Sequence, residues 1–288
     1  DGSVTVNADN SGQTVTQGST STPDEAPVIT QRGSSAETSN TITINASENA
    51  TANVTISNVN IDTSSAAIAT SGKGNVNIEL DGTNTLKSGV DHAGLEKNSD
   101  GNQGKLTITD ENANGKLIAT GGDYGAGIGG DDQGNGKNIT ITGGEVTAAG
   151  GGNGAGIGGG LRKEGEKITV SGDATLKVQG GLTDEWDGAG AGIGNGGRHN
   201  GDTGSFIPVN GAETEPDTSN LTTGKIEYYA PGADMTKDEP TSTTFGSLVQ
   251  PEPSSPGETG APVEYRMQTS ASEPVQGNGK STGYKAPV

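Results

Sequence analysis

Three short sequence patterns recur in a fixed order along the middle of this chain, and this repetition limits the possible fold more than any other feature. The first pattern alternates a β-branched residue or leucine with Thr or Asn. Its copies begin at Val54, Val76, Leu106, Ile139 and Ile168, at spacings of 22, 30, 33 and 29 residues. Period-two alternation of this kind is typical of a half-buried β-strand, with one face inward and the other in water.

The second pattern also alternates and follows each copy of the first, whereas the third joins two small residues to Ile or Leu. Copies of the second pattern are Val59–Ile61, Thr85–Leu86, Leu117–Ala119, Val146–Ala148 and Leu176–Val178. Copies of the third are Ala66–Ile68, Ala93–Leu95, Ala126–Ile128, Ala155–Ile157 and Ala191–Ile193. Three short strands per repeat predict an all-β fold, a parallel β-helix of five to six coils. We expect the five residues that begin the first pattern to lie directly over one another.

The composition agrees with such a fold and excludes several classes of function. Only 27% of the residues are hydrophobic, against about 45–50% in an ordinary globular domain. A stacked coil needs few inward side chains, because its backbone groups pair with the neighbouring coils. The net charge of −19 argues against nucleic acid, and the absence of cysteine excludes disulfides and thiolate metal sites. No apolar run reaches the roughly 18 residues of a membrane span, so we expect no membrane insertion.

Proline divides the chain into three parts, because it is excluded from central strands. Apart from Pro23 and Pro27, all prolines lie from Pro208 onward. We therefore predict a polar N-terminal cap or fringe over residues 1–40, the β-helix over 41–207, and a Pro/Ser/Thr/Glu-rich linker or stalk over 208–288. Within the last part, residues 225–229 and 263–267 have some strand character.

Glycine is abundant, with 51 residues, and a glycine inside a strand needs a reason because it weakens the strand. Paired glycines such as Gly121-Gly122 and Gly150-Gly151 predict turns with positive φ, and the Ala-Gly-Ile segments predict close backbone packing. The alternative is a flat backbone surface that a ligand can approach. A dinucleotide site is excluded, because the G-x-G element at Gly125 recurs and an acidic loop follows it where a helix is needed.

The repeats resemble a known group of proteins. Asn75–Lys87, Ala93–Lys97, and Gly125-Ala-Gly-Ile-Gly-Gly followed by Ile139–Ala148 are similar to the glycine-rich β-helical repeats of large adhesin-like or carbohydrate-binding surface proteins of Gram-positive bacteria. The resemblance covers residues 41–204. It implies a right-handed β-helix in a secreted, extracellular protein attached to the cell wall as part of a larger chain. It transfers no ligand-binding residue, and the long last repeat, 188–204, departs from it.

Two of the few aromatic residues predict a sugar-binding surface. Tyr124 and Trp186 both fall in the turn that leads into the third pattern. Asp123, Asp184 and Asp187 are their neighbours. Aromatic faces stack on sugar rings while carboxylates accept hydrogen bonds from sugar hydroxyls. The alternative interpretation is that the two aromatic side chains only cover the apolar ends of strands.

Acidic loops are candidate calcium sites, because carboxylate and amide oxygens on flexible loops suit Ca²⁺. Asp131 and Asp132 form one such loop, and Asp100 belongs to another. Neither loop matches a known calcium motif, and solvated acidic loops are the alternative. No other cofactor is predicted.

The function that we predict from the sequence is non-catalytic: a cell-surface adhesin or carbohydrate-binding module that recognises a glycan or a host surface glycoprotein. One alternative is a polysaccharide lyase or glycosidase, since His92 and Glu96 lie four residues apart beside Asp91 and suit acid–base chemistry. Arg162 and Arg198 are further candidates for such an enzyme. The other alternative is a structural spacer or a protein-binding surface.

Overall fold

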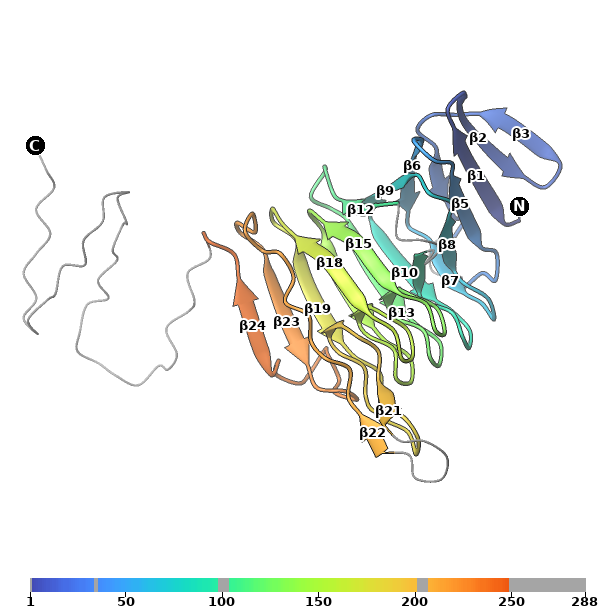
Figure 1. Ribbon diagram of the computed structural model, residues 1–288. Helices are drawn as coiled ribbons and strands as arrows, with labels where there is room; N and C mark the ends of the chain where they lie inside the picture. The colour runs from blue at the N-terminus through green and yellow to red at the C-terminus, as the bar shows by residue number, and fades with distance from the viewer. Residues whose placement is uncertain (1, 34–35, 98–103, 201–206, 249–288) are drawn as a thin grey trace, which may run out of the picture. The chain divides into compact units, whose positions relative to one another are not determined.

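The computed structural model describes residues 2–33, 36–97, 104–200 and 207–248. These residues form β-strands and turns without a helix, as the sequence predicts. Almost all the strands belong to three sheets, A, B and C, in which parallel pairing predominates (Figure 1). None of the described residues forms a helix long and apolar enough to cross a membrane.

Sheet A has nine strands, and its neighbours are parallel except at its N-terminal end. In spatial order it contains β20 (Ile193–Gly194), β17 (Ile157–Gly158), β14 (Ile128–Gly129), β11 (Leu95–Lys97), β8 (Ile68–Ser71), β5 (Ile42–Ala46), β1 (Val4–Asp9), β2 (Gly12–Gln17) and β3 (Thr20–Pro23). The β1–β2–β3 segment is antiparallel and forms the N-terminal edge in Figure 1. The strands of sheet A from β8 to β20 therefore begin at the Ile or Leu of the third pattern, whereas β1, β2, β3 and β5 precede its first copy.

The two alternating patterns form most strands of sheets B and C, and β4, β23 and β24 are added at their ends. Sheet B is wholly parallel and contains β18 (Gly165–Val170), β15 (Gly136–Ile141), β12 (Leu106–Thr109), β9 (Asn75–Asp81), β6 (Thr51–Ser57) and β4 (Val28–Thr30). Sheet C contains β24 (Ser242–Phe245), β23 (Lys225–Tyr229), β19 (Thr175–Gln179), β16 (Glu145–Ala149), β13 (Lys116–Thr120), β10 (Thr83–Lys87) and β7 (Asn60–Asp62). A separate antiparallel hairpin joins β21 (Arg198–Asn200) to β22 (Ile207–Val209).

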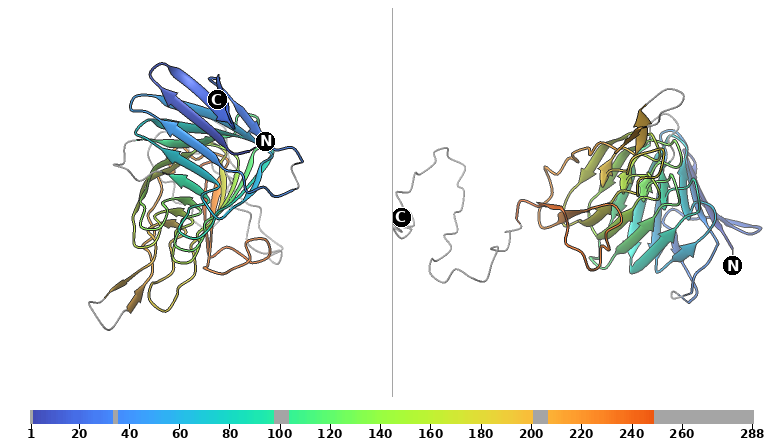
Figure 2. Two further views of the ribbon diagram at one scale, coloured as in Figure 1. Left: turned by 90° about the vertical axis from the view of Figure 1, so that its right-hand side faces the viewer. Right: turned by 90° about the horizontal axis from the view of Figure 1, so that it is seen from below.

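Consecutive strands enter the three sheets in rotation. From β5 to β20 the chain visits sheets A, B and C in that order, so each sheet receives every third strand. Figure 2 shows the same strands from two further directions. The three sequence patterns therefore correspond to three sheets, and each repeat contributes one strand to each of them.

Apolar side chains that occupy the same register in neighbouring repeats form the core. In sheet A, Leu95 pairs with Ile68 on one side and with Ile128 on the other, and all three are fully buried. Each such side chain contributes roughly 1.5–3 kcal/mol through removal from water. In sheet B, the outward residues between buried ones, such as Thr107 and Thr169, are partly exposed. A few residues per repeat are thus enough to fill the core.

The expected stacking of the first pattern is wrong at one of its five positions. Val76, Leu106, Ile139 and Ile168 pair in sequence as expected. Val54 pairs instead with Ile78, and Ala52 is the residue opposite Val76. The shift is two residues, so Val54 still faces inward, because side chains alternate with a period of two. The alternation sets the face of a strand, and the connecting turns set its register.

Close packing of the backbone, more than a positive φ, requires the glycines of the repeats. Of the paired glycines in the repeats, Gly144 has a φ of +83°, whereas Gly121, Gly122, Gly150 and Gly151 are outside the positive region. A Cβ atom on Gly122 would lie 1.8 Å from the carbonyl oxygen of Gly89, and one on Gly151 would lie 1.8 Å from that of Gly122. A Cβ atom on Gly127, in one of the Ala-Gly-Ile segments, would lie 2.7 Å from the carbonyl oxygen of Gly156, so the prediction of close backbone packing there holds. The prediction of positive φ holds at Gly144 and is wrong at the two pairs Gly121-Gly122 and Gly150-Gly151.

The C-terminal part of the described chain extends sheet C and covers the edge of sheet A. β23 pairs in parallel with β19, and β24 pairs antiparallel with β23. The linker predicted from Pro208 onward is therefore wrong for residues 225–245, where Ile226 and Tyr228 continue the apolar positions of sheet C. At the edge of sheet A, the carboxylate of Glu213 accepts hydrogen bonds from the backbone N–H groups of Gly192 (2.7 Å) and Ile193 (3.0 Å). Residues 263–267 lie outside the described residues.

Candidate ligand groove

A groove of about 400 Å³ opens on the turns that precede the strands of sheet A. We call it the 152 groove, after the glycine in its floor. Its lining residues are Asp123, Tyr124, Gly150, Gly151, Gly152, Asn153, Gln179, Gly180, Gly181, Leu182, Thr183, Asp184 and Gly232. They come from three successive repeats and from the segment after β23, so the groove depends on the stacking of the turns.

Backbone hydrogen bonds hold equivalent turn residues side by side. The N–H of Tyr124 donates to the carbonyl oxygen of Gly152 (2.8 Å), and the N–H of Asn153 donates to that of Leu182 (3.0 Å). Asp123, Gly152 and Leu182 therefore occupy matching positions in three neighbouring turns. Gly152 has no side chain, whereas its neighbours carry a carboxylate and an isobutyl group, so a depression forms above it.

Gly152 has room for a side chain, unlike the glycines beside it. A Cβ atom at this position would have Asp123 Oδ1 as its nearest neighbour, at 3.4 Å, which is an ordinary contact. The same atom on Gly151 would lie 1.8 Å from a backbone oxygen. Steric need therefore explains Gly151, but it does not explain Gly152. The empty floor above Gly152 is a feature of this turn that close packing does not require.

Two residues of the groove adopt a left-handed backbone conformation. Tyr124 has a φ of +74° and Asn153 has a φ of +63°. Asn tolerates this region, whereas an aromatic residue is uncommon in it. Residues held in such conformations cost of the order of 1–3 kcal/mol and concentrate at functional sites. Tyr124 is thus placed at the groove at a conformational cost.

The structure brings three of the five predicted sugar-binding residues to one groove. Asp123, Tyr124 and Asp184 line it. Trp186 is not part of the lining and is 54% exposed, two residues beyond Asp184 on the same loop. Trp186 lies in the predicted turn, but the residue there that matches Tyr124 is Thr183, so the predicted shared position is wrong and only Tyr124 contributes to the groove wall.

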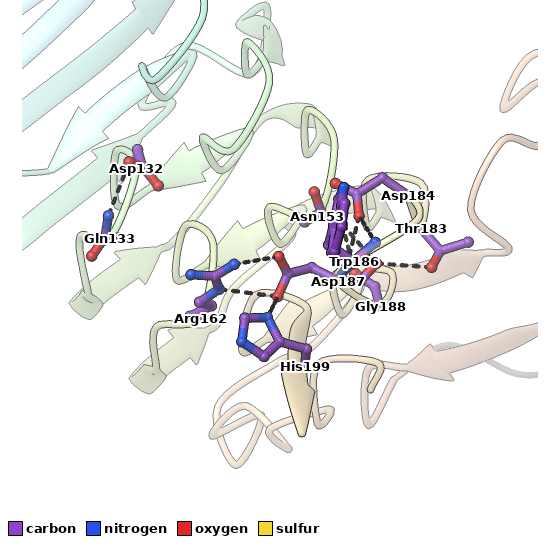
Figure 3. A network of polar contacts seen from close by, with 10 residues as sticks. All are labelled: Asp132, Gln133, Asn153, Arg162, Thr183, Asp184, Trp186, Asp187, Gly188 and His199. Carbon is purple, nitrogen blue, oxygen red and sulfur yellow. Dashed lines mark hydrogen bonds and ion pairs between the residues drawn. The ribbon is translucent and has the colours of Figure 1, made fainter. Parts of the chain in front are cut away.

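Asp187 differs from its predicted role, because its carboxylate is buried and fully engaged. Arg162 donates to it through Nε (3.0 Å to Oδ1) and Nη2 (2.6 Å to Oδ2). His199 Nδ1 lies 2.9 Å from Oδ1 (Figure 3). Asp187 is only 2% exposed, so it cannot accept a hydrogen bond from a ligand in the groove. It anchors the 182–188 loop, which carries Asp184 and Trp186.

The charges around Asp187 fix its ionisation. Burial by itself would raise the pKa of Asp187, but the hydrogen bonds from Arg162 and His199 and their charges outweigh burial, so the pKa lies below its usual range. Arg162 lies in the repeat before the loop and His199 in the β21–β22 hairpin after it. Sequence reasoning missed this network, since nothing in the spacing of these residues indicates their contact.

A second polar cluster surrounds His92. The His92 Nδ1 atom lies 2.9 Å from Glu96 Oε2. Burial, followed by the charge of Glu96, raises the pKa of Asp131 to about 6. The N–H of Asp132 donates to the carbonyl oxygen of Asp91 (2.8 Å), which brings the 131–134 loop to this turn. The structure thus places Asp131 close to His92 and Glu96, the two residues predicted to suit acid–base chemistry.

The calcium interpretation finds no support in the described part of the chain. No group of three or more His, Cys, Asp or Glu side chains there is arranged to hold a metal ion. Asp132 Oδ2 accepts a hydrogen bond from Gln133 (3.3 Å), and its buried Oδ1 has no hydrogen-bond partner among the residues that the structure describes. Asp100 lies outside the described residues, so calcium binding through it stays a prediction.

Comparisons of this chain with protein-family models, with curated proteins and with solved structures find no match. The interpretation of the 152 groove therefore rests on the chemistry of its own residues.

Proposed function

We propose that this protein binds a glycan in the 152 groove and does not alter it chemically. In this proposal the three sheets are the faces of a right-handed parallel β-helix, and the groove lies on its flank. The protein would act outside the cell as an adhesin or carbohydrate-binding module within a larger wall-attached chain. The rotation of consecutive strands among the sheets supports the β-helix, and the resemblance of the repeats to bacterial surface proteins supports the location.

The observation that carries the proposal is the combination of one aromatic wall with several oxygen acceptors in an open groove. Tyr124 and Leu182 supply apolar surface, and Asp123 and Asp184 supply carboxylates. A sugar ring needs both, because its C–H face packs on apolar side chains while its hydroxyls donate hydrogen bonds. Asp184 Oδ1 accepts from the N–H groups of Trp186 and Asp187, both at 2.7 Å, so the carboxylate is held in place.

Filling the groove is expected to weaken binding without unfolding the protein. In the Gly152→Leu variant the new side chain would occupy the floor, and we expect glycan affinity to fall at least tenfold, which is about 1.4 kcal/mol. Gly152→Ala is the matched control, because its Cβ has only an ordinary contact with Asp123. A glycan array with and without Ca²⁺ would identify a ligand, and calorimetry would give the affinities. Equal affinities of Gly152→Leu and the unaltered protein would place the site elsewhere.

Tyr124 is tested separately. We expect Tyr124→Ala to weaken binding about tenfold through loss of the stacking surface. Alanine at a φ of +74° is strained as tyrosine is, so backbone strain changes little between the two proteins. Unchanged affinity in this variant would show that Tyr124 only covers the strand ends.

The His92 cluster favours catalysis as a second candidate function. A histidine in contact with Glu96, beside a carboxyl group whose pKa is about 6, suits general acid–base chemistry at a glycosidic bond. Incubation with a panel of polysaccharides tests this alternative. New reducing ends or unsaturated uronates that disappear in the Glu96→Gln variant would establish it, and their absence would count against it. A folded protein that binds no glycan would support the spacer interpretation.

A further inference from the structure

We infer that the 152 groove selects glycans that carry free, positively charged amino groups over acetylated or acidic glycans. This inference rests on the proposed function and specifies its ligand class. It follows from the hydrogen-bonding state of each polar side chain in the groove, and from the fact that none of the described lining residues is cationic.

Three lining side chains that have donor groups use them inside the protein. Gln179 Nε2 donates to the carbonyl oxygens of Ala230 (2.6 Å) and Ala233 (2.8 Å). Asn153 Nδ2 donates to those of Asp187 (3.0 Å) and Gly188 (2.9 Å). Thr183 Oγ1 donates to that of Asp187 (2.9 Å). An amide nitrogen has two hydrogens and a hydroxyl has one, so these side chains have only acceptor capacity left.

The remaining polar side chains add acceptors. Asp123 and Asp184 are carboxylates, and Asp123 Oδ1 lies over the floor at the position that a Gly152 side chain would approach. Asn153 is fully buried, and its Oδ1 has no hydrogen-bond partner among the described residues. The hydroxyl of Tyr124 is the one side-chain group of the described lining that retains a proton to donate. Because Asn153 is as inaccessible as Asp187, the acceptors that a ligand reaches are the carboxylates of Asp123 and Asp184.

A groove whose side chains offer many hydrogen-bond acceptors and few donors discriminates between closely related sugars. An ammonium group supplies three donors and a positive charge, and it meets two carboxylates. An N-acetyl group presents a carbonyl oxygen, for which only the Tyr124 hydroxyl remains as a side-chain donor. A carboxylate or sulfate on the sugar would meet Asp123 and Asp184 at close range and would also be repelled by the net charge of −19.

The test compares oligosaccharides that differ only in acetylation. We would titrate the protein with a glucosamine tetramer, its fully N-acetylated counterpart and an oligogalacturonate, at about pH 6, where an amine of ordinary pKa is largely protonated. Calorimetry gives the affinities, and the fluorescence of the single Trp186 gives a second signal from the adjoining loop. We expect the glucosamine tetramer to bind at least ten times more tightly than the acetylated one, and the galacturonate not to bind.

Two double variants separate the groove from the general negative charge. Asp123→Asn with Asp184→Asn keeps the side-chain shapes and should remove the preference for the amine. Glu48→Gln with Glu145→Gln changes the net charge equally at side chains that are 63% and 70% exposed, and should leave the preference intact. Equal losses in both variants would show nonspecific attraction of a polycation and overturn the inference. Equal affinity for the two tetramers would overturn it while the glycan proposal stands, whereas a glycan array without any hit would remove the proposal itself.

Discussion

The Gly151→Ala variant is expected to lose more than about 4 kcal/mol of stability, which is an exceptional effect for one methyl group. The added Cβ would lie 1.8 Å from the carbonyl oxygen of Gly122 and 2.3 Å from its carbonyl carbon. Both atoms belong to the backbone, so no side-chain rotation relieves the clash. Neighbouring strands are fixed about 4.8 Å apart by their hydrogen bonds, and separating them would break the pairing of the turn on both sides.

Guanidinium denaturation followed by far-UV circular dichroism measures this loss. Gly152→Ala is the matched control, because it adds the same methyl group one residue later with 3.4 Å of clearance. We expect the control to be neutral or to stabilise the protein by about 0.4–1 kcal/mol, since φ is outside the positive region and alanine restricts the unfolded chain. A Gly151→Ala protein that unfolds at the same denaturant concentration as this control would show that the turns are less tightly stacked than described.

The second large effect is expected for Asp187→Asn. This change leaves Arg162 and His199 without their anion and breaks the anchor of the 182–188 loop. Removing one partner of a fully buried ion pair costs about 3–5 kcal/mol. Because the Arg162 side chain is 43% exposed, we expect a smaller loss of about 2–3 kcal/mol. Trp186 lies on the same loop, so its fluorescence should change, and binding in the 152 groove should weaken through displacement of Asp184.

The stability lost in Asp187→Asn should depend on pH. The pKa of Asp187 is lowered in the folded protein, so its contribution to stability is complete above the unfolded pKa of about 3.9. That contribution disappears as the pH falls through the folded value. The difference in stability between the unaltered protein and Asp187→Asn should therefore be constant near neutral pH and shrink below about pH 4. Glu185→Gln, on the same loop and exposed, is the control. A difference that persists at lower pH would contradict the role of the ion pair.

The strands of the repeats are predictable from the sequence because their signal is local. Alternation of apolar and polar residues sets which face of a strand is buried, and it identified strands of sheets B and C such as those around Ile139 and Val146. The register of Val54 was not predictable, since it depends on the turn before it. The strand at 225–229 was visible as an alternation, but the surrounding prolines indicated a linker.

The candidate site was predictable in part, because its residues lie in turns that repeat along the sequence. Asp123, Tyr124 and Asp184 all fall in turns that precede the third pattern, and counting along the repeats places these turns on one side of the sheets. Gly152 leaves an open groove floor because no backbone atom lies close to where its Cβ atom would be, and the sequence does not reveal this. Asp187 anchors its loop through Arg162 and His199, which lie in other segments of the chain. Sequence alone cannot distinguish a carboxylate that faces a ligand from one that holds a loop.

The carboxylate of Glu213 has a consequence for self-association. Parallel, in-register sheets that end in bare strands are templates onto which other chains can add and grow into fibrils. At the last strand of sheet A, the donors that an incoming strand would need are already bound to Glu213, and the antiparallel β24 follows the last parallel strand of sheet C. The carboxylate of Glu213 and the backbone of residues 212–214 thus protect this edge of sheet A against the addition of another strand.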